Sequence, residues 1–289
     1  MNHFSSLVSQ LSVTTITLWI YMSLVYIVAI GKSRNDLADV AWGPGFMVAA
    51  LAAFSYSAQP SSPLFLQPFS QISKPSGLIF LLLSLWALRL AIYIFRRNRN
   101  QGEDFRYRKW REEWGKTLYW RAYLQIFMLQ GFFLFVIGLP IWGMPIWDPA
   151  PLLPSESRFH LVLGTLVWLA GFLCESIADF QMASFKKTKK DPQAILDSGL
   201  WRYSRHPNYF GEILVHWGLY WVCVAQGTPL WTAVGPLTLT VLLVKVSGVP
   251  MLEKKYDRHP AYQRYQRETS ALIPWFKKTS QKAEPKRLR

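Results

Sequence analysis

The stretch GLIFLLLSLWALRLAIYIF at residues 77–95 indicates the class of fold. It is apolar almost throughout, with Arg89 as its one charged residue. A helix needs about 20 residues to cross the hydrocarbon core of a bilayer, so this stretch is long enough to span it. A helix also satisfies its own backbone hydrogen bonds, which lipid cannot do. Residues 77–95 therefore predict a transmembrane helix.

Six further apolar stretches occur along the 289-residue chain. They are Leu11–Ile30, Val40–Ser57, Leu118–Ile141, His160–Phe180, Tyr209–Ala225 and Trp231–Leu252. Val40–Ser57 and Tyr209–Ala225 are short for a span. The sequence predicts an all-α, polytopic membrane protein with about seven transmembrane helices.

The distribution of lysine and arginine predicts the orientation of these spans. With seven spans, the segments 31–39, 96–117, 181–208 and 253–289 lie on one side of the membrane, and they hold 27 of the 32 basic residues. The opposite side holds only Lys74 and Arg158. Because short cytoplasmic loops are enriched in basic residues, we expect the N-terminus outside and the C-terminus in the cytoplasm.

The composition excludes several other classes of protein. A net charge of +15 would suggest nucleic acid in a soluble protein. Here the basic residues, including most of the run Arg96–Arg111, are explained by orientation and by a surface of anionic lipid, so no nucleic-acid partner is expected. Two cysteines cannot form a disulfide framework or a zinc cluster, and five scattered histidines do not form the histidine boxes of di-iron enzymes. No metal site is expected.

Ionisable residues inside the spans point to a polar pocket. They are Arg89, Arg121, Glu175, Asp179, Glu212, His216 and Lys245. Such residues cost about 2.5–3.5 kcal/mol each on insertion scales and face the interior of a helix bundle. With the predicted orientation, most of them lie in the cytoplasmic half of the membrane. A binding pocket open to the cytosol explains the cluster, and ion pairs that only hold helices together are the alternative.

The most informative motif is DSGLWRYSRHPNYFGE at residues 197–212. Gly199 ends one element, and Pro207 is suited to the first turn of the next helix. Arg205 and His206 would lie at the positive start of that helix, with Glu212 in its early turns. Such an arrangement suits a phosphorylated or carboxylated ligand.

This motif resembles the C-terminal domain of the steroid 5-alpha-reductase family, above all its bacterial branch, and it is similar to sterol C14 and C7 reductases. Further matching stretches are Glu175–Lys186, Glu253–Tyr256, Tyr262, Tyr265 and Ala271–Trp275, and Asp39–Phe46 resembles the bacterial branch alone. The resemblance implies NADPH-dependent reduction of a carbon–carbon double bond conjugated to a carbonyl, in a lipid-like substrate. It further implies that the cofactor enters from the cytosol.

Carried over residue by residue, the resemblance places one set of side chains at the cofactor. The set is Asp179, Lys186, Trp201, Arg205, His206, Asn208, Tyr209 and Glu212. The reductases also carry an arginine on the last helix, where this chain offers only Lys245. The acidic residue and the tyrosine that polarise the substrate carbonyl have no clear equivalents, and Asp39 and Tyr93 are the candidates for this catalytic role.

Two other functions stay open. The Arg-His-Pro-x-Tyr-x-Gly pattern is also similar to isoprenylcysteine and phospholipid methyltransferases, whose pocket binds S-adenosylmethionine. Asn208, Asp179 and the basic residues that suit a pyrophosphate favour the reductases. The third function is that of a non-catalytic membrane protein that binds a ligand.

The chain is expected to have two functional parts and a tail. Residues 1–154 would form the substrate side and residues 155–276 the cofactor side, followed by a basic disordered tail at 277–289. The resemblance implies the bacterial inner membrane, or the endoplasmic reticulum if the host is eukaryotic.

Overall fold

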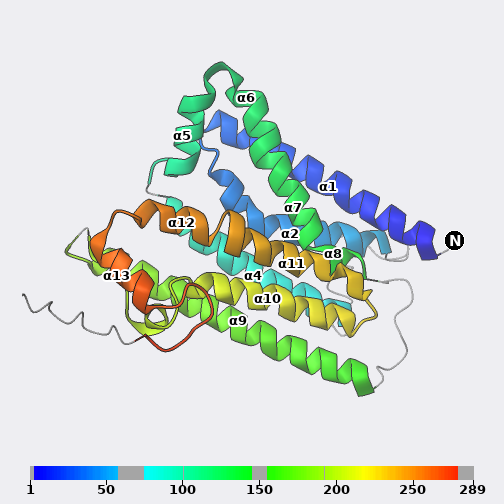
Figure 1. The fold of residues 1–289 in the computed structure, drawn as a ribbon. Helices are drawn as coiled ribbons and strands as arrows, with labels where there is room; N and C mark the ends of the chain where they lie inside the picture. Colours follow the sequence, from blue (N-terminus) through cyan, green and yellow to red (C-terminus); the bar gives the residue numbers. More distant parts are fainter. Residues whose placement is uncertain (1–2, 58–74, 100, 145–154, 192, 279–289) are drawn as a thin grey trace, which may run out of the picture. The chain divides into compact units, whose positions relative to one another are not determined.

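The computed structural model describes residues 3–57, 75–99, 101–144, 155–191 and 193–278. This part of the chain is helical and contains no strand, which confirms the all-α class (Figure 1). The α-helices are α1 (His3–Gly31), α2 (Leu37–Ser57), α4 (Pro75–Asn98), α5 (Phe105–Trp114), α6 (Leu118–Arg121), α7 (Leu129–Ile137), α8 (Leu139–Trp142), α9 (Ser155–Thr188), α10 (Pro207–Val224), α11 (Val234–Val241), α12 (Val249–Tyr256) and α13 (Pro260–Glu268).

Six helical stretches in the described residues are long and apolar enough to cross a membrane. They are Leu7–Gly31, Leu37–Ser55, Gly77–Asn98, Phe105–Ile137, Ser157–Thr188 and Leu230–Lys254. Each of them contains or overlaps one of the predicted spans. The chain is therefore a multi-pass membrane protein by the length and composition of its helices.

The sixth predicted span in chain order, Tyr209–Ala225, is helical as α10 but is not among the six membrane-length stretches. Asn208, Glu212 and His216 lie within the 18 residues of this helix and lower its hydropathy. The number of spans and the positions of the two termini relative to the membrane stay predictions. Of the predicted tail at 277–289, residues 279–289 lie outside the described part of the chain.

The chain divides into two compact units. Unit 1 comprises Met1–Trp168 and Val215–Leu239, and unit 2 comprises Leu169–Leu214 and Thr240–Arg289. The division falls within α9, α10 and α11 rather than at a loop. The proposed split into a substrate side and a cofactor side at residue 154 concerns function, and it stays a prediction.

Unit 1 has an aromatic core around α2. This helix packs against both α1 and α4 (Figure 1). The Phe46 ring lies 5.6 Å from that of Trp86 and 6.3 Å from that of Trp142, between ring centroids. The imidazole of His216 joins this cluster, 4.7 Å from the Trp86 ring. His216, which the sequence places among the intramembrane ionisable residues, is therefore buried among aromatic side chains.

Unit 2 depends on a close approach of α9 and α10. A methyl group on Gly211 would lie 2.5 Å from the Glu175 nitrogen and 2.7 Å from the Gly171 carbonyl oxygen. Only glycine allows two helix backbones to come this near, as in the small-residue contacts of membrane helices. The approach brings the first turns of α10 against the part of α9 that carries Glu175.

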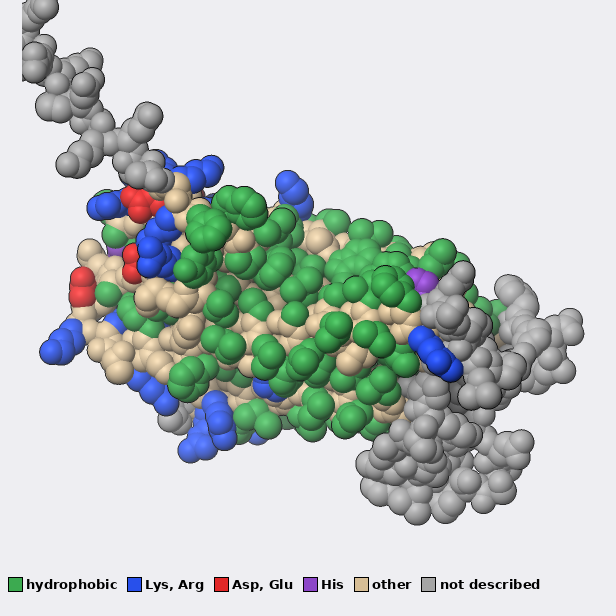
Figure 2. Space-filling view, turned by 90° about the horizontal axis from the view of Figure 1, so that it is seen from below, with side chains coloured by type: hydrophobic (Ala, Val, Ile, Leu, Met, Phe, Trp, Pro, Cys, Tyr) green, Lys and Arg blue, Asp and Glu red, His purple; other side chains and the backbone are tan. Residues whose placement is uncertain are grey.

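The surface fits a lipid environment. Large apolar side chains are exposed along the predicted spans, for example Ile27 on α1, Leu88 on α4 and Leu166 on α9. Figure 2 shows hydrophobic side chains over much of the visible face. A soluble monomer rarely exposes so much contiguous apolar surface, so these side chains are expected to contact acyl chains.

Candidate functional site

A buried tyrosine–aspartate pair lies in unit 1. The Tyr107 hydroxyl donates to Asp39 Oδ1 over 2.5 Å, and the Arg106 guanidinium donates to Asp39 Oδ2 over 2.8 Å. Gln130 Nε2 in turn donates to the Tyr107 oxygen over 3.3 Å. The Tyr107 side chain is only 3% exposed. A phenol between a carboxylate and an amide donor is held in one orientation, as a proton-transferring group must be.

The backbone around this pair is fixed by charged hydrogen bonds. Asp104 caps α5, because its side chain accepts a hydrogen bond from the Arg106 backbone nitrogen over 3.0 Å. It also accepts a hydrogen bond from the Arg106 guanidinium. Burial raises the pKa of Asp104, but the hydrogen bonds and charge of Arg106 outweigh it and hold this pKa below its usual range. Arg106 thus ties the start of α5 to Asp39 on α2.

Each of the two loops beside the site has an ion pair of its own, and hydrogen bonds join the loops. The Arg34 guanidinium binds both oxygens of Asp36, over 2.8 and 2.7 Å, and this pairing raises the pKa of Arg34. Glu103 accepts from the Asn35 nitrogen over 2.7 Å and from the Arg111 guanidinium. The contacts Asn35–Glu103 and Asp39–Tyr107 join the same two segments of the chain. They are four residues apart in each segment.

Tyr93, the other predicted catalytic residue, is in a different setting. It lies on α4, and the guanidinium carbon of Arg97 is 6.0 Å from the centre of its ring. The tyrosine that the structure brings to Asp39 is Tyr107. Tyr107 and Arg106 lie within the basic run that the sequence assigns mainly to the membrane surface. One feature of the sequence pointed to the contact of Tyr107 with Asp39. The predicted orientation puts segments 31–39 and 96–117 on the same side of the membrane.

In unit 2, the motif at 197–212 folds into a loop anchored to α9. Gly199 has a φ of +60°, and the next nitrogen, of Leu200, donates to Gln181 Oε1 over 3.0 Å. The Trp201 indole donates to the Ala178 carbonyl over 3.1 Å. Trp201 is therefore buried against α9. The Tyr265 hydroxyl donates to the carbonyls of Trp201 and Ser204, so α13 also holds the loop.

Arg205 and His206 converge on one carboxylate, that of Glu253 on α12. Arg205 Nε donates to Glu253 Oε1 over 2.7 Å, and His206 Nε2 lies 3.2 Å from the same oxygen. Arg205 Nη1 also donates to the carbonyls of Gln266 and Thr269. The His206 ring stacks on Tyr209, with 5.5 Å between centroids. These contacts tie the loop to the C-terminal segment, and a direct contact of Arg205 with a phosphate stays a prediction.

The remaining predicted cofactor residues differ in exposure. Asp179 is buried, at 4%, next to Ala178 and so close to Trp201. The Cys174 thiol donates to the Pro207 carbonyl over 3.3 Å, which places the start of α10 beside the same stretch of α9. Asn208, Tyr209 and Glu212 follow in the first turns of α10 and are half-buried, whereas Lys186 and Lys245 are exposed.

Comparison with known protein families gives a match for most of this chain. A family model described as "Protein of unknown function (DUF1295)" matches residues 25–269. The chain belongs to the DUF1295 family. No curated protein and no solved structure matches it. The family match covers Asp39, Tyr107, the loop at 197–212 and Glu253.

In this DUF1295 protein, Glu253→Gln is expected to destabilise unit 2. The change removes the charge that pairs with Arg205, whose side chain is 11% exposed, and with His206. Loss of one partner of a buried pair costs about 3–5 kcal/mol, and because Glu253 is partly exposed we expect about 2–3 kcal/mol. Thermal unfolding in detergent measures the effect.

Glu268→Gln is the matched control for this variant. Glu268 pairs with Arg264 one helical turn away, and that guanidinium is exposed. Such pairs contribute little to stability. Equal midpoints for the two variants would contradict a structural role of Glu253.

Proposed function

We propose that this chain is an integral membrane oxidoreductase that reduces a carbon–carbon double bond conjugated to a carbonyl, in a lipid or steroid-like substrate, with NADPH as the reductant. The Asp39–Tyr107 pair carries the proposal. The family is related to steroid 5-alpha-reductase-like proteins. The resemblance to those reductases implies an acidic residue and a tyrosine at the substrate carbonyl. In unit 1 these two residue types share a hydrogen bond in a buried setting.

The chemistry requires a proton donor next to the carbonyl oxygen. NADPH, when bound, supplies a hydride to the β-carbon of the substrate. The protein must then stabilise the negative charge on the carbonyl oxygen and donate one proton to it. The enol becomes the saturated carbonyl compound when its α-carbon takes a proton from water and its oxygen returns a proton to the tyrosine. The Tyr107 hydroxyl can turn from Asp39 toward that oxygen, while Gln130 and Arg106 keep the tyrosine and the carboxylate in place.

Side chains of unit 2 fit a nucleotide in part. Asp179 and Asn208 offer groups for a ribose or an amide, and they belong to segments that pack together at the start of α10. The positive end of α10 and the exposed Lys186 and Lys245 suit phosphates. We assign Arg205 and His206 mainly to holding the loop in shape, because Glu253 and backbone carbonyls bind Arg205 Nε and Nη1 and Glu253 faces His206 Nε2.

One observation favours a second candidate, an S-adenosylmethionine-dependent methyltransferase of the isoprenylcysteine type. The positive charge of Arg205 favoured the pyrophosphate of NADPH over the sulfonium of S-adenosylmethionine as the ligand. Its pairing with Glu253 weakens that argument. Glu175 and Asp179, both buried in unit 2, would suit a cationic sulfonium. The reductase remains our proposal because only it makes use of the Asp39–Tyr107 pair.

Thermal stability with added ligands tests the choice. The protein is purified in detergent and titrated with NADPH, NADH and S-adenosylmethionine. A ligand at one hundred times its dissociation constant stabilises by about 2.7 kcal/mol. We expect stabilisation by NADPH that is lost in Asp179→Asn and in Asn208→Ala and is retained in Asp257→Asn, a control at an exposed carboxylate.

The other outcomes of this titration redirect the assignment. Stabilisation by S-adenosylmethionine alone would support the methyltransferase. No response to any of the three would favour a non-catalytic ligand-binding protein. For a reductase of the bacterial branch, we further propose the bacterial inner membrane as the location, or the endoplasmic reticulum in a eukaryotic host.

A further inference from the structure

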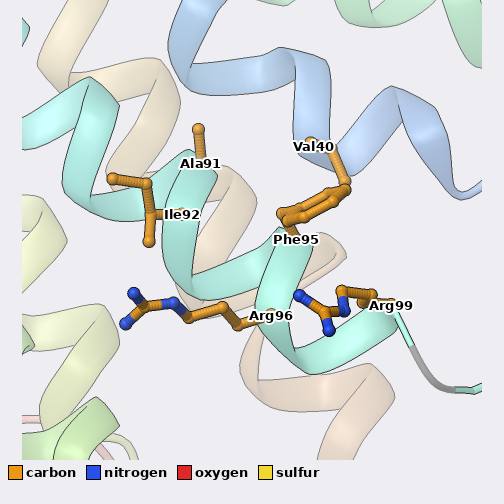
Figure 3. Close-up of a pocket in the computed structure, with 6 residues that line it drawn as sticks. All are labelled: Val40, Ala91, Ile92, Phe95, Arg96 and Arg99. Atoms are coloured by element: carbon orange, nitrogen blue, oxygen red, sulfur yellow. The ribbon is translucent and has the colours of Figure 1, made fainter.

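An open groove lies in unit 1 beside the last turns of α4. It has a volume of about 320 Å³ and is lined by Val40, Ala91, Ile92, Phe95, Arg96 and Arg99. This volume is at the lower end of the roughly 300–1,000 Å³ of pockets that hold small ligands. Figure 3 shows both arginines at the end of α4, with the Arg96 side chain running toward Ile92 and that of Arg99 lying nearer Phe95.

The two arginines of the groove differ from the arginines near them. Arg34 pairs with Asp36, Arg111 with Glu103, and Arg106 with Asp39 and Asp104. In the part of the chain that the structure describes, the guanidiniums of Arg96 and Arg99 have no hydrogen bond or ion pair. The carboxylates of this region are thus already matched to other cations. Two positive charges face the groove with no anion from the described protein.

The rest of the groove is apolar and belongs to a membrane span. α4 supplies the span Gly77–Asn98, and both arginines lie at its end, where we expect lipid headgroups to meet water. Ile92 and Phe95 precede them by one turn and are 49% and 51% exposed. A ligand that fits must be anionic at one end and hydrocarbon at the other. A free nucleotide or phosphate would leave the apolar wall unused.

We propose that this groove binds an anionic phospholipid, with its phosphate on Arg96 and Arg99 and an acyl chain against Ile92 and Phe95. Guanidinium groups bind phosphate oxygens through paired N–H donors. Basic pockets at the cytoplasmic ends of membrane helices attract such headgroups. The lining of the groove includes neither Asp39 nor Tyr107, and the proposal does not depend on the proposed reductase activity.

Native mass spectrometry of the full chain in a neutral detergent tests the proposal. The probes are phosphatidylglycerol and phosphatidylcholine with identical acyl chains. We expect phosphatidylglycerol to bind at least tenfold more tightly, and Arg96→Gln/Arg99→Gln to remove this preference. Arg108→Gln/Lys116→Gln removes the same charge at exposed positions outside the groove and should retain the preference.

A further variant separates the groove from general charge. Val40→Trp leaves the charge unchanged and fills the apolar wall, so it should weaken phosphatidylglycerol binding even if the arginine variant folds poorly. Equal loss in the two charge variants would overturn the proposal, as would unchanged binding in Val40→Trp. Displacement of the lipid by millimolar inorganic phosphate or NADPH would also overturn it, because the groove would then be a site for soluble phosphates.

Discussion

Tyr107→Phe is expected to lower the rate of substrate reduction by about 100- to 10,000-fold, the usual contribution of a positioned proton donor. The change deletes only the hydroxyl that contacts Asp39 and Gln130. The binding of NADPH, which we assign to side chains of unit 2, should be unaffected. The rate is measured as NADPH oxidation in lipid nanodiscs with a bilayer-soluble enone, and the binding of NADPH as a thermal shift.

Tyr93→Phe is the control for this prediction, because Tyr93 is the tyrosine named from the sequence alone and it also lies on a membrane span. Its ring, beside Arg97, is retained in the variant. We expect it to keep most of the activity. If Tyr93→Phe were inactive and Tyr107→Phe active, Tyr107 would not be the proton donor.

Gly211→Ala is expected to destabilise the protein by about 3 kcal/mol or more. Overpacking costs about 1–3 kcal/mol where side chains can move aside. Here the added methyl group would lie 2.5 Å from the Glu175 nitrogen and 2.7 Å from the Gly171 carbonyl oxygen, and backbone cannot yield so easily. Thermal unfolding in detergent measures the change.

Gly102→Ala is the matched control, since a methyl group on Gly102 would have nothing within 4 Å. Its midpoint should equal that of the parent protein. A Gly211→Ala protein as stable as Gly102→Ala would show that α9 and α10 pack less closely than the structure has them. The positions of Glu175 and the start of α10 would then need revision.

The membrane spans could be predicted from the sequence because the thickness of the bilayer sets the length of an apolar helix that crosses it. A run such as 77–95 must be helical in lipid whatever it packs against, and it is helical as α4. α10 was harder to classify. Protein contacts shield its two ionisable side chains to different degrees, because His216 is buried in the aromatic core of unit 1 and Glu212 is half-buried in unit 2.

The partners of the site residues could not be predicted in the same way. Asp39 was named from a resemblance, but its contact with Tyr107 joins residues 68 positions apart and depends on how α2 and α5 pack. Arg205 was expected at a phosphate because it precedes a helix. Its pairing with Glu253 depends on the C-terminal segment folding back onto the loop, which no local pattern encodes.

Isotope transfer tests the central claim most directly. The protein in nanodiscs is incubated with NADPH deuterated at the transferring position and with lipid extracted from the host membrane. If the chain is a reductase, a lipid product gains one deuterium and one ordinary hydrogen, and Tyr107→Phe prevents this gain. If no lipid acquires deuterium, and a methyl group from labelled S-adenosylmethionine enters the lipid instead, the chain is a methyltransferase and the reductase proposal is wrong.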